Sequence, residues 1–287
     1  MRGRLGRLPE SRRSPDRWAP EQPYECELYV AAPSQQKGRV MIDIHSHLLP
    51  GVDDGSPSLD VSIPVLQRFA AQGVTILVCT PHLNASQAAS APYAQHCELL
   101  VQLLAVAPAG LEIQLGWEIM LDSPGVDLTA PEFCLGNSRA LLVEFTRGGL
   151  PRGATSELRR IARSGRTPIL AHPERYFGCT LELVREWRAL GVVIQTDASV
   201  LMGRGVPADL ANAMLAEGLI DILASDNHGD ARSLGAARDW LTERGADEQM
   251  DLLLRANAER VLGDEDPLPV PPLRAGLVGR IKRIFGR

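Results

Sequence analysis

The chain has 287 residues, of which 45% are hydrophobic and 23% charged, with a formal net charge of -5. This is an ordinary globular composition, and it excludes a largely unfolded chain or one that spans a bilayer. Both ends are basic, so the body between them is strongly acidic, which argues against a nucleic-acid partner. The odd number of cysteines without paired spacing and the lack of an apolar leader favour a reduced, cytoplasmic location.

The two ends of the chain differ in composition from its centre. Residues 1–39 are rich in Arg, Pro, Ser and Gln without a sustained period, which predicts a disordered basic extension. A single domain is predicted over 40–263, followed by a Pro-rich linker and a basic tail over 264–287. Apolar residues in 274–287 follow helical spacing between basic ones, which fits an amphipathic helix at a membrane surface or on a partner. Packing on the domain or disorder are the alternatives for this tail.

Apolar runs with strand-like residues alternate with amphipathic stretches along the central domain. The runs cover 40–47, 75–82, 112–119, 139–145, 167–174, 192–198 and 220–228, and the helices predicted between them include 59–71, 93–106, 181–190 and 207–217. Such alternation predicts a parallel sheet with helical crossovers, and seven strands favour an α/β fold of the TIM-like (β/α)7 barrel type. The barrel is expected to be irregular because 121–138 is loop-like where a repeat would carry a helix.

Reactive side chains fall at the carboxyl ends of these runs, which share one face of a barrel and carry the chemistry there. In His45-x-His47 alternate side chains of a strand converge, and Asp226-x-His228 repeats this geometry. His96, on a predicted helix, is interpreted as an ordinary surface or packing histidine. The reactive residues are His45, His47, His82, Glu118, Glu144, His172, Asp226 and His228, joined by Asp54 on an acidic, glycine-bounded loop.

Imidazole and carboxylate together are the ligand set of Zn, Mn or Fe, and so many candidates favour more than one metal ion. Some of these candidate ligands could instead have a structural role: Glu118 could cap a helix, Glu144 could pair with an arginine, and His172 could be a hydrogen-bonded core residue. We favour the ligand role, most strongly for Glu144, because metal coordination would compensate for burying its charge after Leu-Leu-Val.

The ordered motifs resemble one known superfamily. They are Asp-Ile-His-Ser-His with Pro-Gly-Val-Asp-Asp-Gly, then Thr-Pro-His, Gly-Trp-Glu-Ile, Val-Glu-Phe, Ala-His-Pro-Glu-Arg-Tyr and Ala-Ser-Asp-Asn-His. This set resembles the PHP (polymerase and histidinol phosphatase) superfamily over about residues 41–262. Within it the similarity is greatest to the manganese-dependent protein-tyrosine phosphatases of bacterial capsule and exopolysaccharide operons.

The resemblance implies the PHP fold and three divalent metal ions, with Mn(II) expected and Zn, Fe, Mg or Co as alternatives. It assigns His45, His47, Glu118 and Asp226 to one ion, Glu118 as a bridge with Glu144 and His172 to a second, and Asp54, His82 and His228 to a third. Arg175 is similar to a phosphate-binding arginine, with a structural salt bridge to Glu174 or a neighbour as the alternative, and Arg232 is a weaker candidate. Asp197 is a departure, since the family more often has Asn there.

The resemblance further implies hydrolysis of a phosphomonoester, namely phosphotyrosine on an autophosphorylating tyrosine kinase that controls polysaccharide export. Asp226 or His228 would supply a proton through water. The alternatives are a histidinol-phosphate-like small-molecule phosphatase, a nuclease, or a non-catalytic module that docks a kinase. Cys179 and Arg185 have the Cys-x5-Arg spacing of thiol-based phosphatases, but we interpret this as chance because the intervening residues lack glycine and start a helix.

Overall fold

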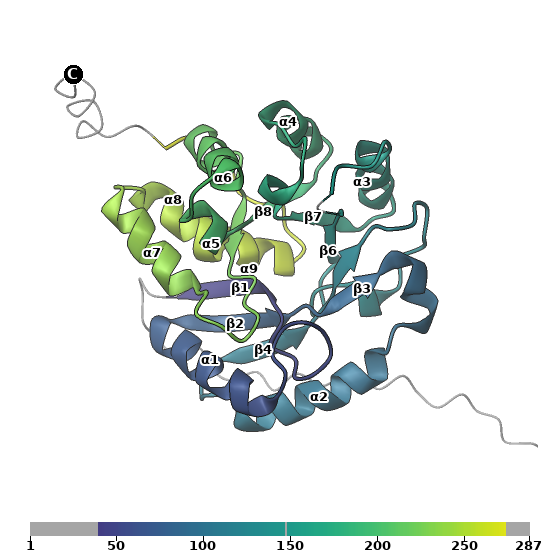
Figure 1. Ribbon diagram of the computed structural model, residues 1–287, viewed down its shortest axis with the longest axis vertical. Helices are drawn as coiled ribbons and strands as arrows, with labels where there is room; N and C mark the ends of the chain where they lie inside the picture. Colours follow the sequence, from purple (N-terminus) through teal and green to yellow (C-terminus); the bar gives the residue numbers. More distant parts are fainter. Residues whose placement is uncertain (1–39, 147, 274–287) are drawn as a thin grey trace, which may run out of the picture.

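Parallel strands form the centre of the protein and helices surround them (Figure 1). The computed structural model describes residues 40–146 and 148–273. The strands are β1 (Met41–Ser46), β2 (Val74–Cys79), β3 (His82–Asn84), β4 (Glu112–Leu115), β5 (Glu118–Met120), β6 (Ala140–Glu144), β7 (Thr167–Ala171), β8 (Val193–Asp197) and β9 (Ile222–Ala224).

The α-helices lie outside the strands. They are α1 (Leu59–Gln72), α2 (Tyr93–Val106), α3 (Ala154–Arg163), α4 (Leu181–Ala189), α5 (Ala198–Leu201), α6 (Val206–Glu217), α7 (Leu234–Glu243), α8 (Asp247–Asp251) and α9 (Asn257–Leu262). A π-helical turn (Leu252–Ala256) joins α8 to α9, and single 3-10 segments cover Ala85–Ser90, Pro131–Phe133 and Pro173–Arg175. Local chemistry sets several ends: the Thr180 side chain accepts from the Leu183 N–H at the start of α4, and left-handed Gly73 ends α1.

The strands pair in the orders β1-β2-β4 and β3-β5-β6-β7-β8-β9, and every pairing is parallel. A parallel bridge between Ser46 and Asn227 brings the end of the second sheet beside β1. Because β3 and β5 continue the chain from β2 and β4, the two sheets form one irregular ring. The predicted irregular (β/α)7 TIM-like barrel is therefore confirmed, including the loop-like character of 121–138.

Two predicted runs differ from the structure because each is interrupted. The run 75–82 breaks at Thr80 and Pro81, where proline has no N–H for the ladder, and the run 112–119 breaks at Gly116 and Trp117. A Cβ at Gly116 would lie 2.5 Å from the Leu135 side chain, so only glycine allows this close approach. His82 and Glu118 were predicted at the ends of strands; instead each begins a short strand, and the two residues pair directly.

Side-chain alternation along β6 explains how a carboxylate comes to lie at the end of an apolar strand. Leu141 and Val143 pack in the large apolar cluster that joins the sheet to the helices, whereas Ala140 and Leu142 pack in a smaller cluster shared by β1, β6, β7, β8 and β9. Glu144 has the same alternation as Ala140 and Leu142, so it extends the inner row. The apolar part of the strand thereby fixes the direction of its last residue.

The predicted Pro-rich linker over 266–272 packs onto the domain. Asn257 exchanges two hydrogen bonds with the backbone of Leu268, and the Gln249 amide donates to the carbonyls of Pro271 and Pro272. Val270 is buried. The predicted extension over 1–39 and the predicted amphipathic tail over 274–287 lie outside the described residues, and among those described no helix is long and apolar enough to cross a bilayer.

Candidate metal centre

Two histidines and two carboxylates, from β1, β5 and the end of β9, meet at one point. The Nε2 atoms of His45 and His47 lie 3.2 Å apart. Glu118 Oε2 is 3.3 Å from both nitrogens, and Asp226 Oδ1 is 3.4 Å from that of His45 and 3.3 Å from that of His47. Both histidines predicted for the first ion therefore lie beside both of its predicted carboxylates, and His45, His47 and Asp226 form one candidate metal group.

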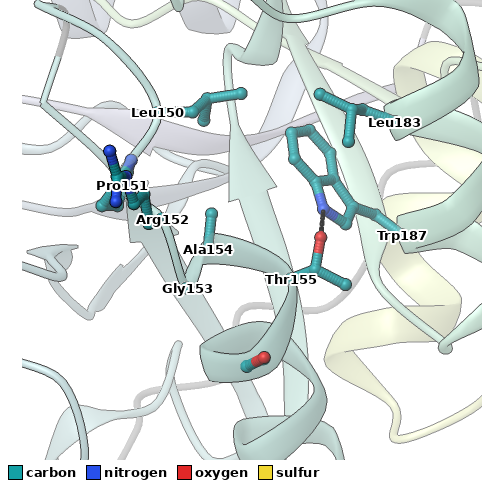
Figure 2. A pocket seen from close by; sticks show the side chains of 9 residues that line it. Leu150, Pro151, Arg152, Gly153, Ala154, Thr155, Leu183 and Trp187 are labelled. Carbon is teal, nitrogen blue, oxygen red and sulfur yellow. Dashed lines mark hydrogen bonds between the residues drawn. The ribbon is translucent and has the colours of Figure 1, made fainter.

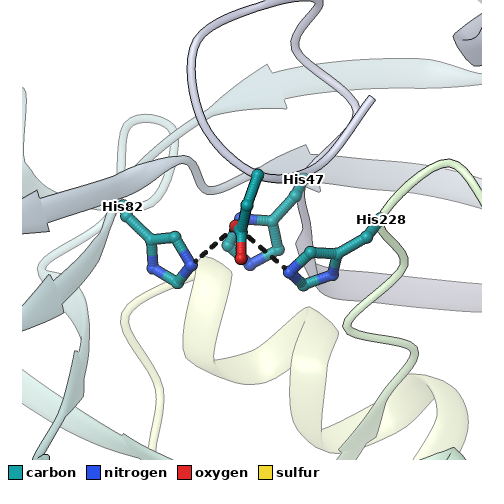
Figure 3. A group of neighbouring side chains, drawn as sticks. His47, His82 and His228 are labelled. Carbon is teal, nitrogen blue, oxygen red and sulfur yellow. Dashed lines mark ion pairs between the residues drawn. The ribbon is translucent and has the colours of Figure 1, made fainter. Parts of the chain in front are cut away.

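A second group of histidines lies around the acidic loop that follows β1. Figure 3 shows His82, His47 and His228 gathered beneath this loop. Asp54 Oδ1 is 3.2 Å from His82 Nε2 and 3.5 Å from His228 Nε2, and its side chain is 73% exposed. The three residues predicted for the third ion thus converge at the solvent-facing side of the cluster.

The deepest part of the cluster centres on Glu118. Its Oε1 accepts a hydrogen bond from His172 Nε2 at 2.7 Å, and its Oε2 is 3.0 Å from His82 Nδ1. Glu144 lies beside both histidines, with oxygens 3.6 Å from His82 Nδ1 and 3.9 Å from His172 Nε2. The residues predicted for the second ion are brought together, and His82 and His47 each belong to more than one candidate group.

Burial and mutual attraction shift the acidity of these groups in opposite directions. Burial alone would raise the pKa of Glu118 and Asp226, but His45 and the other histidines around them hold both carboxyl pKa values far below their usual range. Burial lowers the pKa of His172 and, with the nearby His47, that of His228. Although burial opposes it, the neighbouring carboxylates raise the pKa of His45, His47 and His82, so these three imidazoles would release protons when metal binds. Ionised carboxylates and neutral imidazoles are the forms that bind metal ions.

The donor set fits divalent cations. Four carboxylates and five imidazoles converge, and no thiolate is among them. Within the described part of the chain, the buried Asp226 Oδ1 and His172 Nδ1 make no hydrogen bond. Buried carboxylate oxygens gathered around lone-pair nitrogens require compensation, and cations would supply it.

The backbone is strained at two residues of the cluster. His172 (φ 35°), the first residue after β7, and Asp226 (φ 48°), the second residue after β9, adopt left-handed conformations. For residues other than glycine this costs on the order of 1–3 kcal/mol each, and such strain concentrates at functional sites. Here it turns both side chains from the ends of their strands into the cluster.

Two arginines border the cluster through the same carboxylate oxygen. Arg175 Nη2 lies 2.7 Å from Asp226 Oδ2, and Arg232 Nη1 lies 3.2 Å from it. Arg175 also donates to Asp197 Oδ2, so its salt bridge is with Asp197 and Asp226 and not with Glu174. Glu174 is buried, which raises its pKa to about 8, and it accepts from the Asp197 backbone N–H. Both predicted phosphate-binding arginines are therefore at the site.

Gln195 and Tyr176, which had no predicted role, and Asp53, which the sequence marked only as a further carboxylate of the acidic loop, orient the cluster. Gln195 Oε1 accepts from His45 Nδ1 at 3.0 Å, and Asp53 Oδ2 accepts from His47 Nδ1 at 2.7 Å, which leaves both Nε2 lone pairs directed at the centre. The Tyr176 hydroxyl donates to the Ala171 carbonyl and accepts from the Phe145 N–H, and it thereby joins the ends of β6 and β7.

The acidic loop can reach the cluster because of one glycine. A Cβ at Gly55 would lie 2.2 Å from the carbonyl oxygen of His47, so a larger residue would push the loop away from the strand. Asp53 additionally accepts from the backbone N–H of His82, which ties the loop to β3. The signal that could have identified Asp53 is its position beside Asp54 in the glycine-bounded loop.

His96 and Cys179 lie apart from the cluster, as the sequence predicted. His96 is buried in α2, and its ring stacks on Trp117 with 4.6 Å between centroids, so it is a packing histidine. Burial raises the pKa of the Cys179 thiol to about 12, and Arg185 pairs with Glu217 on the surface. A thiol with this pKa is not a nucleophile at neutral pH.

The parallel barrel and its cluster of histidines and carboxylates define a class of protein that holds metal ions at the carboxyl ends of its strands. The family described as "Capsular polysaccharide synthesis, CpsB/CapC" matches residues 41–263, and the chain belongs to this family. This confirms the resemblance inferred from the motifs.

Similar proteins agree with this assignment. The chain is 30% identical over 196 residues to the "Putative tyrosine-protein phosphatase CapC" of Staphylococcus aureus, covering 66% of this chain and 77% of that protein. It is 27% identical over 252 residues to the "Tyrosine-protein phosphatase YwqE" of Bacillus subtilis, covering 81% and 95%. A solved structure described as one of YwqE from Bacillus subtilis and CpsB from Streptococcus pneumoniae, "unique metal-dependent tyrosine phosphatases", matches with a TM-score of 0.65 and 26% identity, covering 81% of this chain and 98% of that chain.

Proposed function

We propose that this protein is a metal-dependent protein-tyrosine phosphatase. The observation that carries the proposal is that the Nε2 atoms of His45 and His47 lie 3.2 Å apart and each lies within 3.5 Å of a carboxylate oxygen of both Glu118 and Asp226. The names of the family's members supply the reaction. A binding module would have no physical need for so many buried carboxylates, which counts against a role limited to docking a kinase.

Three divalent ions, with Mn(II) as the expected metal, are proposed for the cluster. His45, His47, Glu118 and Asp226 would hold one ion, and Glu118, Glu144 and His172 a second. Asp54, His82 and His228 would hold the third. Bound ions of this kind lower the pKa of water toward neutrality and offset phosphoryl charge.

The protein's own groups would bind and orient the phosphoryl ester. Arg175 and Arg232 are partly exposed and both contact Asp226, so their guanidinium groups would exchange this carboxylate for phosphate oxygens when substrate binds. A tyrosyl leaving group has a pKa near about 10 and departs without strong acid help. A proton relayed through water from Asp226 or His228 would neutralise the departing tyrosyl oxygen.

The substrate is proposed to be an autophosphorylating tyrosine kinase of polysaccharide export, and the setting is proposed to be the cytoplasm. The capsule-synthesis description of the family supports this substrate. Peripheral membrane contact through 274–287 remains part of the proposal because that segment combines basic residues with apolar ones at helical spacing.

A comparison of substrates tests the proposed function. The purified chain, loaded with Mn(II), is expected to hydrolyse a phosphotyrosyl peptide faster than histidinol phosphate, and to leave DNA intact. Faster hydrolysis of histidinol phosphate would indicate a small-molecule phosphatase, and cleavage of DNA would indicate a nuclease.

Cys179→Ser is expected to leave the phosphatase rate within about twofold of wild type, because the Cys179 thiol is protonated at neutral pH. The rate on p-nitrophenyl phosphate with Mn(II) measures this. A loss comparable to that of a metal-ligand variant would instead support a thiol nucleophile.

Gln195→Ala is expected to weaken metal binding by at least about 10-fold, because it removes the acceptor that fixes the His45 ring. Isothermal titration calorimetry with Mn(II) measures the metal affinity directly. Gln249→Ala is the matched control, since Gln249 is also a buried glutamine but bonds to the carbonyls of Pro271 and Pro272. Equal metal affinities for the two variants would show that Gln195 does not orient His45 for metal binding.

A further inference from the structure

Helix α3 carries a row of arginines that is not neutralised by neighbouring acids. Ser156, Arg159 and Arg163 follow one another at intervals of three and four residues, so they share one face of the helix, and Arg152 lies just before the Gly153 cap at its N-terminal end. We call this row the α3 stripe. Its three arginines make no ion pair with any residue that the structure describes, whereas Arg160 on the same helix pairs with Glu157.

The rest of the described surface lacks such a row. Most other arginines in 40–146 and 148–273 pair with a carboxylate; the exceptions are Arg68 and Arg166, which donate to backbone carbonyls, and Arg204. The chain between its basic ends is strongly acidic. The α3 stripe is therefore a local positive surface on a negative body, and it would attract an acidic segment selectively.

A pocket of about 340 Å³ adjoins the N-terminal end of the α3 stripe. Figure 2 shows Leu150, Leu183 and Trp187 around it, with Arg152 at one side. The Trp187 ring is fixed because its Nε1 donates to Thr155 Oγ1 at 2.9 Å. Arg152 and Ser156 belong to both the pocket and the stripe, so an apolar side chain and its acidic neighbours could bind side by side.

The topology of the barrel connects the pocket and the stripe to the strand that carries Glu144. Glu144 is the last residue of β6, and the pocket-lining residues begin six positions later in the chain, at Leu150. Because β6 and β7 are parallel, α3 must run back along the outside of the barrel. The α3 stripe thus leads away from the face where the phosphate would bind.

We propose that the α3 stripe and its pocket dock the acidic segment that flanks the phosphotyrosine in the substrate protein, with an apolar side chain of that segment in the pocket. This inference rests on the proposed phosphatase function. A peptide is favoured over a nucleic acid because the pocket has the size and lining for an apolar side chain and because the acidic body repels an extended polyanion.

The test compares two phosphotyrosyl peptides that differ only in glutamate or serine at the positions flanking the tyrosine. The wild-type full chain is expected to favour the acidic peptide, and Arg159→Gln with Arg163→Gln should reduce kcat/KM on that peptide by roughly 3- to 10-fold, mainly through KM. Rates on the serine peptide and on p-nitrophenyl phosphate should stay unchanged. Arg204→Gln is the matched control, because Arg204 is exposed and has no acidic partner among the described residues.

Binding of the unphosphorylated acidic peptide, followed by fluorescence anisotropy, separates docking from catalysis. Binding that weakens in the double variant supports the docking surface even if no phosphatase activity is found. The inference is overturned if the double variant keeps the wild-type preference, if Arg204→Gln causes the same loss, or if the α3 stripe binds duplex DNA or anionic phospholipid vesicles but not the acidic peptide.

Discussion

Replacing His45 with alanine is expected to lower the phosphatase rate by at least about 10³-fold. His45 Nε2 lies within 3.5 Å of His47, Glu118 and Asp226, so its loss removes a proposed ligand from the centre of the cluster. Metal stabilisation of transition-state charge is worth several kcal/mol, and each 1.36 kcal/mol is a tenfold change in rate. Rates on p-nitrophenyl phosphate and metal content per chain should fall together.

His96→Gln is the matched control for this variant, because His96 is also a buried histidine but stacks on Trp117 and belongs to no candidate metal group. It is expected to change thermal stability without changing metal content. Circular dichroism establishes that both variants are folded. A folded His45→Ala protein with wild-type activity would contradict the proposed metal centre.

Replacing Arg175 with alanine is expected to lower kcat/KM by about 10- to 100-fold, since hydrogen bonds to charged groups contribute roughly 1.5–3 kcal/mol. Arg175 bridges Asp197 and Asp226 in the structure, and the proposed role is to transfer this contact to phosphate. Initial rates across substrate concentrations, measured on a phosphotyrosyl peptide, give the change. Metal content should remain that of the wild type.

Asp197→Asn separates binding of phosphate by Arg175 from a merely structural salt bridge. Asparagine can still accept from the Ser199 N–H at the start of α5, so the local fold should survive while the charge partner is lost. Because Asp226 still holds Arg175, kcat/KM should change less than about fivefold. If Asp197→Asn loses as much activity as Arg175→Ala, the salt bridge and not phosphate binding explains Arg175.

The sequence was sufficient for the parts of the site that depend on strand periodicity and position. His45 and His47 alternate along one strand, and Glu144 continues the inner row of β6, so pattern alone predicted that they converge. The ring of parallel strands was predicted for the same reason: apolar runs alternate with amphipathic helices at regular spacing.

The remaining contacts depend on tertiary geometry that no local pattern encodes. Gln195 contacts His45 across 150 residues of sequence, and nothing in Val-Ile-Gln-Thr-Asp marks this amide as the partner of a ring nitrogen. The interruptions of two strands follow from Pro81 and from the close approach of Gly116 to Leu135. The choice of Asp197 as the partner of Arg175 depends on the turn after His172, whose left-handed backbone was not predicted.

The most direct test of the central claim is the metal content and phosphotyrosyl-peptide activity of one preparation purified without chelator. We expect three divalent ions per chain, loss of activity when a chelator removes them, and recovery when Mn(II) is restored. Full activity of the metal-free protein on the phosphotyrosyl peptide would contradict the account.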